Sequence, residues 1–326
     1  MMFVFRTLLP AASALLAGLL SLHAHAQGFP EREVRIVVPY SSGGSSDVVA
    51  RHVGAGLQRI WGKPVSVENR PGASGNIGSL EVVRSPSDGH TLLMQNDTML
   101  TNLVVQGRLP YHHETDLTPV AILGKTPLAL VAHPSVSVHD LHSLIDQGKL
   151  RKEPWIYGSC GTGSPAHFVM EMLRQRRALE LVQVGYRGCA PAVRDVIGGQ
   201  IPLAMVSANL VVPHANAGRL KVLGISSAMR YRLLPNVSTF EEQGLRPFDI
   251  STWKAIMGPA GMAPALVARL ADDLDHVMAD PDVQTALQAA GIEITRGDAD
   301  MLRRTIREDL TRYSELANMP GLRSEK

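Results

Sequence analysis

The sequence has 326 residues, and its 32 Lys and Arg nearly balance its 30 Asp and Glu, leaving a formal net charge of +2. This balance provides no electrostatic attraction for nucleic acid, and an aromatic content of 5% leaves few side chains on which bases or sugars stack. No nucleic-acid partner is expected, and the length exceeds what one hydrophobic core usually serves, which predicts two lobes.

The N-terminus has the pattern of a secretory signal peptide. Arg6 precedes an apolar run over residues 8–22, which ends at Ala24-His25-Ala26, a small-x-small cleavage site. The run is shorter than the ~18 to 20 apolar residues that a transmembrane helix requires. We therefore expect residues 1–26 to be removed as a signal peptide. The mature protein, which has Gln27 where a lipoprotein would carry cysteine, is expected in the periplasm.

Short apolar runs alternate with helical patterns along most of the remaining chain. The runs are rich in Val, Ile and Leu and lack polar alternation, as strands buried on both faces do. Predicted strands cover residues 34–38, 65–67, 91–94, 128–132, 181–184, 203–206 and 222–225, and predicted helices cover residues 47–60, 76–84, 166–177 and 191–197. This alternation predicts an α/β fold with two mostly parallel sheets flanked by helices.

The C-terminal part is predicted to be helical after residues 253–258. Leu266, Leu270 and Leu274 recur at helical spacing, and residues 301–316 form another amphipathic stretch. These helices are expected on lobe 1. With crossings near residues 125–132 and 247–253, lobe 1 comprises residues 27–127 and 249–326, and lobe 2 comprises residues 128–248.

Two loops rich in Gly and Ser each lie between a predicted strand and a predicted helix. Residues 39–47 read Pro-Tyr-Ser-Ser-Gly-Gly-Ser-Ser-Asp, and residues 158–165 read Gly-Ser-Cys-Gly-Thr-Gly-Ser-Pro. In an open α/β sheet such loops lie at the carboxyl edge, where N–H groups at helix starts bind anions. Alternatively, the glycines only form tight turns and Ser46 or Asp47 only caps a helix.

Motifs for catalysis and for metal or cofactor binding are weak or missing. The sequence contains no G-x-S-x-G nucleophile elbow. Gly161-x-Gly163-x-x-Ala166 is a poor dinucleotide fingerprint, because the acidic Glu180 precedes the next predicted strand instead of ending it. His139-x-x-His142 has no evident third metal ligand. No enzymatic activity, cofactor or metal is therefore expected.

Several segments resemble the receptors of tripartite tricarboxylate transporters, also called Bug-type binding proteins. The resemblance rests first on residues 34–51, 68–78 and 88–93, which contain Pro-Tyr-Ser-Ser-Gly-Gly-Ser-Ser-Asp, Glu-Asn-Arg-Pro-Gly-Ala-Ser-Gly-Asn and Asp-Gly-His-Thr-Leu-Leu. Residues 157–159, 186–188, 198–200, 217–220 and 259–261 keep the order and spacing of later motifs. It covers nearly the whole mature chain and implies a type II periplasmic binding protein fold whose two lobes close on a carboxylate.

The resemblance also implies a set of ligand contacts. In lobe 1 these are Tyr40, Ser41, Ser42, Ser45, Asp47, Asn96 and Thr98; in lobe 2 they are Ser159, Thr162, Gly163, Ser164, Tyr186, Cys189 and Ser207. Tyr40 and Tyr186 have an alternative as aromatic residues at the edge of the core.

Three positions depart from the family pattern. Val206 stands where many members have an aspartate, and Cys160 and Cys189 replace small residues on loops that the resemblance makes neighbours. In an oxidising compartment we expect a disulfide between these two cysteines. Two small buried thiols, or a thiol pair touching the ligand, are the alternatives. Because Val206 cannot pair with an ammonium group, a ligand without an amine is expected to pack against it.

The function that follows is capture of a small organic acid for the membrane permease of a tripartite transporter, by a protein expected to be a monomer. One alternative is a sensor that presents its ligand to a membrane kinase. Another is an enzyme built on the same fold.

Overall fold

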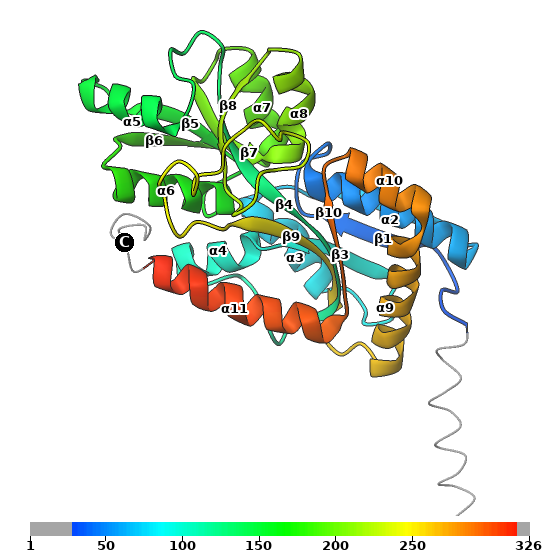
Figure 1. The fold of residues 1–326 in the computed structure, drawn as a ribbon. Helices are drawn as coiled ribbons and strands as arrows, with labels where there is room; N and C mark the ends of the chain where they lie inside the picture. Colours follow the sequence, from blue (N-terminus) through cyan, green and yellow to red (C-terminus); the bar gives the residue numbers. More distant parts are fainter. Residues whose placement is uncertain (1–27, 318–326) are drawn as a thin grey trace, which may run out of the picture.

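The computed structural model describes residues 28–317, so the predicted signal peptide lies outside the described residues. The chain forms two α/β lobes (Figure 1). The first pass through lobe 1 contains β1 (Val34–Val38), α2 (Ser45–Trp61), β2 (Val65–Asn69), the 3-10 turn η1 (Ala73–Gly75), α3 (Asn76–Val83), β3 (Thr91–Asn96) and α4 (Thr98–Gln106). The long strand β4 (Leu117–Ala132) then leads into lobe 2.

Lobe 2 alternates helices and strands before the chain returns. It contains α5 (Leu141–Leu150), β5 (Trp155–Ser159), α6 (Pro165–Arg177), β6 (Leu181–Gly185), α7 (Cys189–Ile197), β7 (Leu203–Ser207), α8 (Ala208–Asn216) and β8 (Lys221–Ile225). The return to lobe 1 contains β9 (Ser251–Pro259), α9 (Pro264–Ala279), α10 (Pro281–Ala289), β10 (Glu293–Gly297) and α11 (Ala299–Ala317). None of the helices in this described part of the chain has the length and hydrophobicity needed to cross a bilayer.

The strand β4 belongs to the sheets of both lobes. Its first part pairs with β9 as far as Pro127, which lies opposite Ser251, and with β10. From Leu128 onward it pairs with β7 and β8. The strand order β2-β1-β3-β9-β4-β7-β5-β6 therefore runs without a break from one lobe to the other.

The predicted α/β class is confirmed, but the sheets are mixed. β1 pairs in parallel with β2 and β3, and β5 with β6 and β7. β1 is a buried run of Val and Ile, as expected for a parallel sheet, whereas Val182 and Val184 of the edge strand β6 are exposed. The strands that pass between the lobes, β4 and β9, pair antiparallel with their neighbours. The description "mostly parallel" was therefore wrong at the junction of the lobes.

Three strands differ from the sequence-based prediction. β4 begins 11 residues before the predicted start at residue 128, because Pro119, Gly124 and Pro127 obscure its strand pattern. Register shifts near Pro119 and Gly124 accommodate these residues within the sheet. β9 was not predicted as a strand, although a crossing was expected near residues 247–253, because Lys254 interrupts its apolar pattern. β10 lies within the tail that was predicted to be helical.

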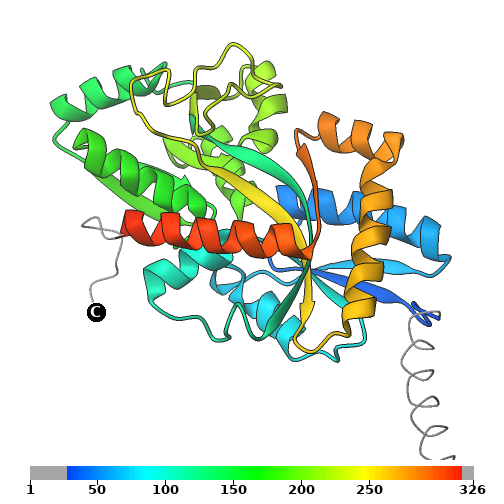
Figure 2. The same cartoon turned by 60° about the horizontal axis from the view of Figure 1, so that its bottom comes forward.

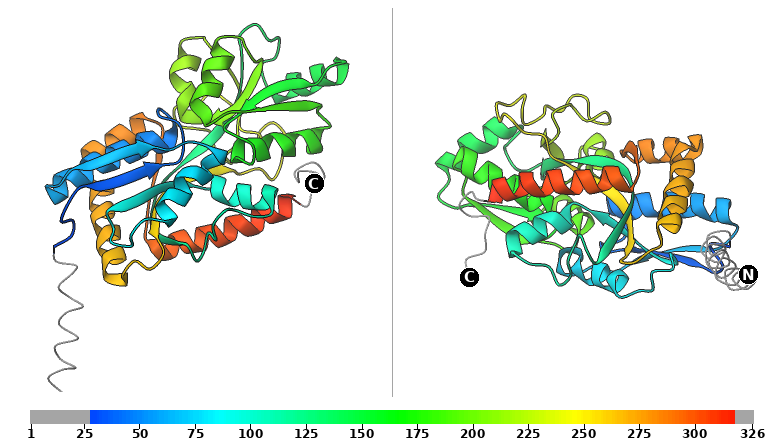
Figure 3. Two further views of the ribbon diagram at one scale, coloured as in Figure 1. Left: turned by 180° about the vertical axis from the view of Figure 1, so that it is seen from behind. Right: turned by 90° about the horizontal axis from the view of Figure 1, so that it is seen from below.

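The C-terminal helices pack on lobe 1, as predicted. α9 and α10 cover the same core as α2, which includes Val49, Leu270 and Leu287. α11 lies across β4 and β9 on the opposite face of the sheet (Figure 2). Its C-terminal end reaches lobe 2 (Figure 3), where the ring of Tyr313 lies 5.5 Å from that of Phe168 in α6. α11 thus contacts both lobes, and so does α10, in which the carbonyl of Gln288 accepts a 2.7 Å hydrogen bond from Arg232 of lobe 2.

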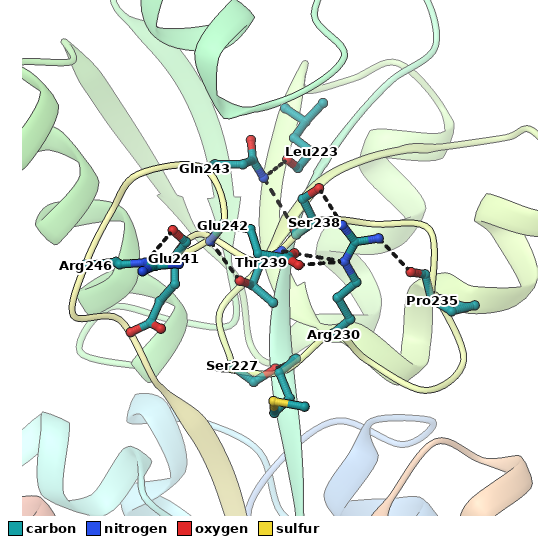
Figure 4. A network of polar contacts seen from close by, with 11 residues as sticks. Leu223, Ser227, Arg230, Pro235, Ser238, Thr239, Glu241, Glu242, Gln243 and Arg246 are labelled. Carbon is teal, nitrogen blue, oxygen red and sulfur yellow. Dashed lines mark hydrogen bonds and ion pairs between the residues drawn. The ribbon is translucent and has the colours of Figure 1, made fainter.

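Side-chain hydrogen bonds hold the irregular segment between β8 and β9 (Figure 4). The Nε atom of Arg230 lies 2.9 Å from both carboxylate oxygens of Glu242. Glu242 also accepts a 2.8 Å hydrogen bond from the backbone N–H of Thr239, and these two partners lower the pKa of its carboxyl group. Gln243 donates to the carbonyl of Leu223 at 2.9 Å, which fixes the segment to β8.

Two glycines in α2 provide a matched test of the contact between α2 and α9. A Cβ atom on Gly56 would lie 2.4 Å from Cγ1 of Val277, whereas one on Gly54 would meet no atom closer than 3.4 Å. We expect Gly56→Ala to destabilise the protein by about 1 to 3 kcal/mol through overpacking. Gly54→Ala should be neutral or stabilise by up to about 1 kcal/mol through helix propensity. Urea unfolding measures both, and equal stabilities of the two variants would contradict the packing.

Candidate functional site

A cavity between the lobes lies where loops of both sheets meet. Its lining residues are mostly small or polar: Tyr40, Ser41, Gly44, Ser45, Ser46, Asn96, Thr98, Leu128, Cys160, Ser164, Pro165, Ala166, Gly188, Cys189, Ser207 and Thr252. Its volume is about 40 Å³. That is room for about three water molecules.

Five helices begin at the walls of this cavity. The first residues of α2, α4, α6 and α7 (Ser45, Thr98, Pro165 and Cys189) line it, and so does Ser207, the N-cap of α8. Backbone N–H groups in the first turn of a helix lack partners within that helix, and the helix dipole makes this end positive. Among the lining residues within the described part of the chain, none is Asp, Glu, Lys, Arg or His. The cavity therefore attracts anions through helix ends and hydroxyls.

The wall from lobe 1 is organised around Tyr40. Its hydroxyl lies 2.6 Å from Oε1 of Gln95 and 2.7 Å from Oδ1 of Asn96, and burial holds the pKa of the phenol well above its usual range. Asn96 also accepts a 2.9 Å hydrogen bond from the N–H of Thr98, the first residue of α4. These bonds hold the end of β3 and the start of α4 at the cavity.

The wall from lobe 2 is fixed by a disulfide between Cys160 and Cys189, whose Cα atoms are 4.2 Å apart. The bond joins the loop after β5 to the start of α7. The sulfur of Cys189 lies 3.7 Å from Oγ of Ser207, and this hydroxyl lies 3.3 Å from Oγ of Ser45 in lobe 1. The two cysteines thus form a neutral, covalently linked surface of the cavity.

The predicted ligand contacts divide into two groups. The cavity is lined by Tyr40, Ser41, Ser45, Asn96, Thr98, Ser164, Cys189 and Ser207. Ser42, Asp47, Ser159, Thr162, Gly163 and Tyr186 are not among its lining residues, although each lies on a loop, a strand end or the first turn of a helix beside it.

The predicted contact residues that do not line the cavity form side-chain hydrogen bonds with other parts of the protein. Ser159 is buried and accepts a 2.7 Å hydrogen bond from Gln183. The hydroxyl of Tyr186 donates to Asp195 at 2.6 Å. Burial, followed by this hydrogen bond, raises the pKa of Tyr186 to about 12. The exposed Ser42 lies near Asp47, with 3.4 Å between its hydroxyl and Oδ2.

Asp47 is not a helix N-cap. The N-cap of α2 is Gly44, and Asp47 lies in the first turn, where it accepts hydrogen bonds from the N–H of Gly43 at 2.9 Å and from Arg51 at 3.0 Å. Burial opposes ionisation of this carboxyl, but these bonds and one from Asn69 outweigh it and lower its pKa. The carboxylate stabilises the first loop and is not a lining group.

Val206 does not contact the cavity, so the expected contact between ligand and Val206 was wrong. Side chains alternate along β7, and Val206 faces a core with Ala129 and Val193 while Ser207 faces the cavity. The lining residues that the sequence-based prediction missed include Ser46, Gly188 and Thr252. Ser46 and Gly188 lie in motifs that had been noted, whereas Thr252 lies in β9, whose strand had not been predicted.

Direct contacts between the lobes close the cleft around the cavity. Ser74 of lobe 1 donates a 2.5 Å hydrogen bond to the carbonyl of Thr162, and Thr101 donates to the carbonyl of Gly163. A Cβ atom on Gly188 would lie 2.4 Å from Oγ of Ser41, so only glycine permits this approach. A ligand larger than a few waters can enter only if the lobes separate.

Two mixed α/β lobes that share a strand and enclose a cavity define a two-lobed solute-binding protein. Residues 49–322 match the family described as tripartite tricarboxylate transporter family receptor. The chain belongs to this family of receptors.

Relatives and solved structures agree with this membership. The chain is 32% identical to Protein BugT of Bordetella pertussis over 91% of each chain. The structure of R. palustris Rpa4515 with adipate has a TM-score of 0.86 and 28% identity, over 89% of this chain and 97% of that one. MatC from Rhodopseudomonas palustris with bound malate has a TM-score of 0.84 and 27% identity, over 89% and 100% of the two chains.

The disulfide closes a loop between cysteines separated by 29 positions. Replacing both cysteines with serine should lower the free energy of unfolding by about 3 to 4 kcal/mol, because the unfolded chain loses this constraint. Thermal unfolding of Cys160→Ser/Cys189→Ser measures the effect, with Ser42→Ala as a surface control. An unchanged melting temperature, or alkylation of both cysteines in unreduced wild-type protein, would contradict the bond.

Proposed function

We propose that this protein is a periplasmic receptor that captures a small dicarboxylate in its interlobe cavity and delivers it to the permease of a tripartite transporter. The observation that carries the proposal is the convergence of five helix starts on a cavity lined by neutral residues. Receptor-family membership and two related structures with adipate and malate support it. The signal-peptide pattern of residues 1–26 and the disulfide both fit an oxidising compartment outside the cytoplasm.

Capture requires the lobes to rotate about the strands that join them. We place the hinge between Pro127 and Leu128, where β4 changes partners, and at the neighbouring residues Ile250 and Ser251. Ile250 donates a 2.9 Å hydrogen bond to Ser226 of lobe 2, whereas Ser251 pairs with Pro127 in the sheet of lobe 1. Closure around a dicarboxylate then replaces water with helix N–H groups and hydroxyls that are already oriented.

The neutral lining also restricts the chemical class of the ligand. An amino acid would bring an ammonium group into the cleft, and burying a charge without a partner costs several kcal/mol. Asp47, the acid near the first loop, is already engaged by Arg51, Gly43 and Asn69. The proposed ligand is therefore a carboxylate without an amine.

Matched ligand pairs test the proposed ligand class. We expect isothermal titration to show tighter binding of malate than of aspartate, which differ by a hydroxyl and an ammonium. Adipate should bind more tightly than neutral adipamide, because only the acid carries charge to the helix starts. The affinity ratio in each pair should be about tenfold or more, which corresponds to about 1.4 kcal/mol. Binding of aspartate or adipamide at least as tight as that of its partner would refute the ligand class.

Closure can be tested at Gly188. Gly188→Ala would place a methyl group against Ser41 of the other lobe, so we expect weaker binding of malate and adipate. Gly218→Ala is the control, since Gly218 also has a positive φ but a Cβ atom on it would meet no other atom within 4 Å. Gly218→Ala should lose about 1 to 2 kcal/mol of stability through backbone strain. Gly188→Ala should lose more, because φ 125° and ψ 172° are adopted almost only by glycine. Equal affinities of the two variants would show that this contact does not limit closure.

A further inference from the structure

A lysine lies buried directly behind the cavity wall. Lys254 of β9 is 0% exposed, and its ammonium group donates hydrogen bonds to the backbone carbonyl of Thr252 at 2.9 Å and to the hydroxyl of Thr252 at 2.7 Å. Thr252 itself lines the cavity. One hydroxyl group therefore separates a buried positive charge from the cavity.

The hydroxyl of Thr252 can link Lys254 to a ligand through two successive hydrogen bonds. It accepts the hydrogen bond from Lys254, and it donates its own hydrogen to the carbonyl of Thr126 at 3.2 Å. Rotation of the hydroxyl would direct this hydrogen to a ligand oxygen instead. A hydroxyl that accepts a hydrogen bond from a cation is polarised and becomes a stronger donor.

Two acidic groups attract the charge of Lys254, Asp97 before α4 and Glu293 of β10. Asp309 of α11 and the phenols of Tyr40 and Tyr313 interact with Asp97. Asp97 attracts Lys254, but its Oδ2 atom accepts a 2.6 Å hydrogen bond from Tyr313. Within residues 28–317, both hydrogen bonds found for the ammonium group go to Thr252, and neither goes to a carboxylate.

Burial disfavours the charged forms of both Lys254 and Asp97. It lowers the pKa of Lys254 to about 7 and raises that of Asp97 to about 7. An anion in the cavity would favour the ammonium form of Lys254 and raise its pKa. Ligand binding above pH 7 would then draw a proton from solvent, and affinity would fall as the pH rises through the pKa of the free protein.

We propose that Lys254 balances the charge of a ligand carboxylate through the hydroxyl of Thr252, and so positions that carboxylate at the hinge side of the cavity. This role rests on the proposed function as a dicarboxylate receptor. It makes Lys254 the main charged residue that determines how the dicarboxylate binds. Lys254 is a positioning residue, because it acts through Thr252 without lining the cavity.

Titration of Lys254→Met with malate and adipate tests this role. We expect the variant to bind both acids about 10- to 100-fold more weakly than wild type at pH 6, since the ligand carboxylate loses the nearby positive charge and Thr252 loses the cation that polarises its hydroxyl. Its melting temperature should fall, because buried Asp97 loses the cation that attracts it. Lys125→Met is the control: Lys125 is exposed on the neighbouring strand β4, and its loss changes the net charge equally. This variant should bind as wild type does.

The outcomes separate the two proposals. Wild-type affinity in Lys254→Met would overturn the role of Lys254 and leave the receptor function intact. If wild type binds neither acid, the dicarboxylate proposal fails and this role fails with it.

If Lys254→Met does not fold, proton uptake by wild type and by Asp97→Asn decides the question, because Asp97 also titrates in this region. Binding heats at pH 8 in phosphate and in Tris, which differ in ionisation enthalpy, give the number of protons taken up. Proton uptake that persists in Asp97→Asn, with weaker binding than at pH 6, supports the role of Lys254. Proton uptake that disappears in Asp97→Asn, or binding without proton uptake in wild type, overturns it.

Discussion

The shared strand β4 constrains the whole molecule. Its first part is hydrogen-bonded into the sheet of lobe 1 and its last part into that of lobe 2, so neither lobe can move without bending β4. The change of partners at Pro127 and Leu128 places that bend at one point of the strand. Leu128 also lines the cavity, and Thr252 lies beside the same point on β9. The candidate site therefore lies beside the proposed hinge.

The cavity can bind an anion although none of its lining residues is charged. Helix starts supply partial positive charge from five directions, and each helix keeps its orientation because it packs on a sheet core. Lys254 stays behind the wall, and in our proposal it acts on a ligand only through the hydroxyl of Thr252. A fully exposed lysine or arginine would bind anions of many shapes in the open state. In the closed protein, by contrast, neutral groups at fixed positions discriminate by geometry.

Much of this architecture could be predicted from local sequence patterns. Buried runs such as residues 34–38 and the Gly-rich loops predicted the parallel strands and the position of the site, because both depend on neighbouring residues in the chain. The polar partners could not be predicted in the same way. Tyr186 hydrogen-bonds to Asp195, and Asp47 hydrogen-bonds to Arg51 and the first loop. These pairings depend on side-chain rotamers, which tertiary packing determines. Thr252 and Lys254 were missed because β9 becomes a strand only by pairing with β3 and β4, which lie far away in the sequence.

Because of the disulfide, the lobe 2 wall of the cavity tolerates amino-acid substitution less than the lobe 1 wall does. It fixes the loop after β5 against the start of α7, so a substitution there must fit a covalently constrained surface. The opposing loop over residues 41–46 has no such bond and is held by hydrogen bonds around Asp47 and Tyr40. Variation in ligand preference among descendants of this protein should therefore accumulate in the lobe 1 loop. The lobe 2 wall would stay the same, and substitutions in the lobe 1 loop would adapt the cavity to ligands of other lengths.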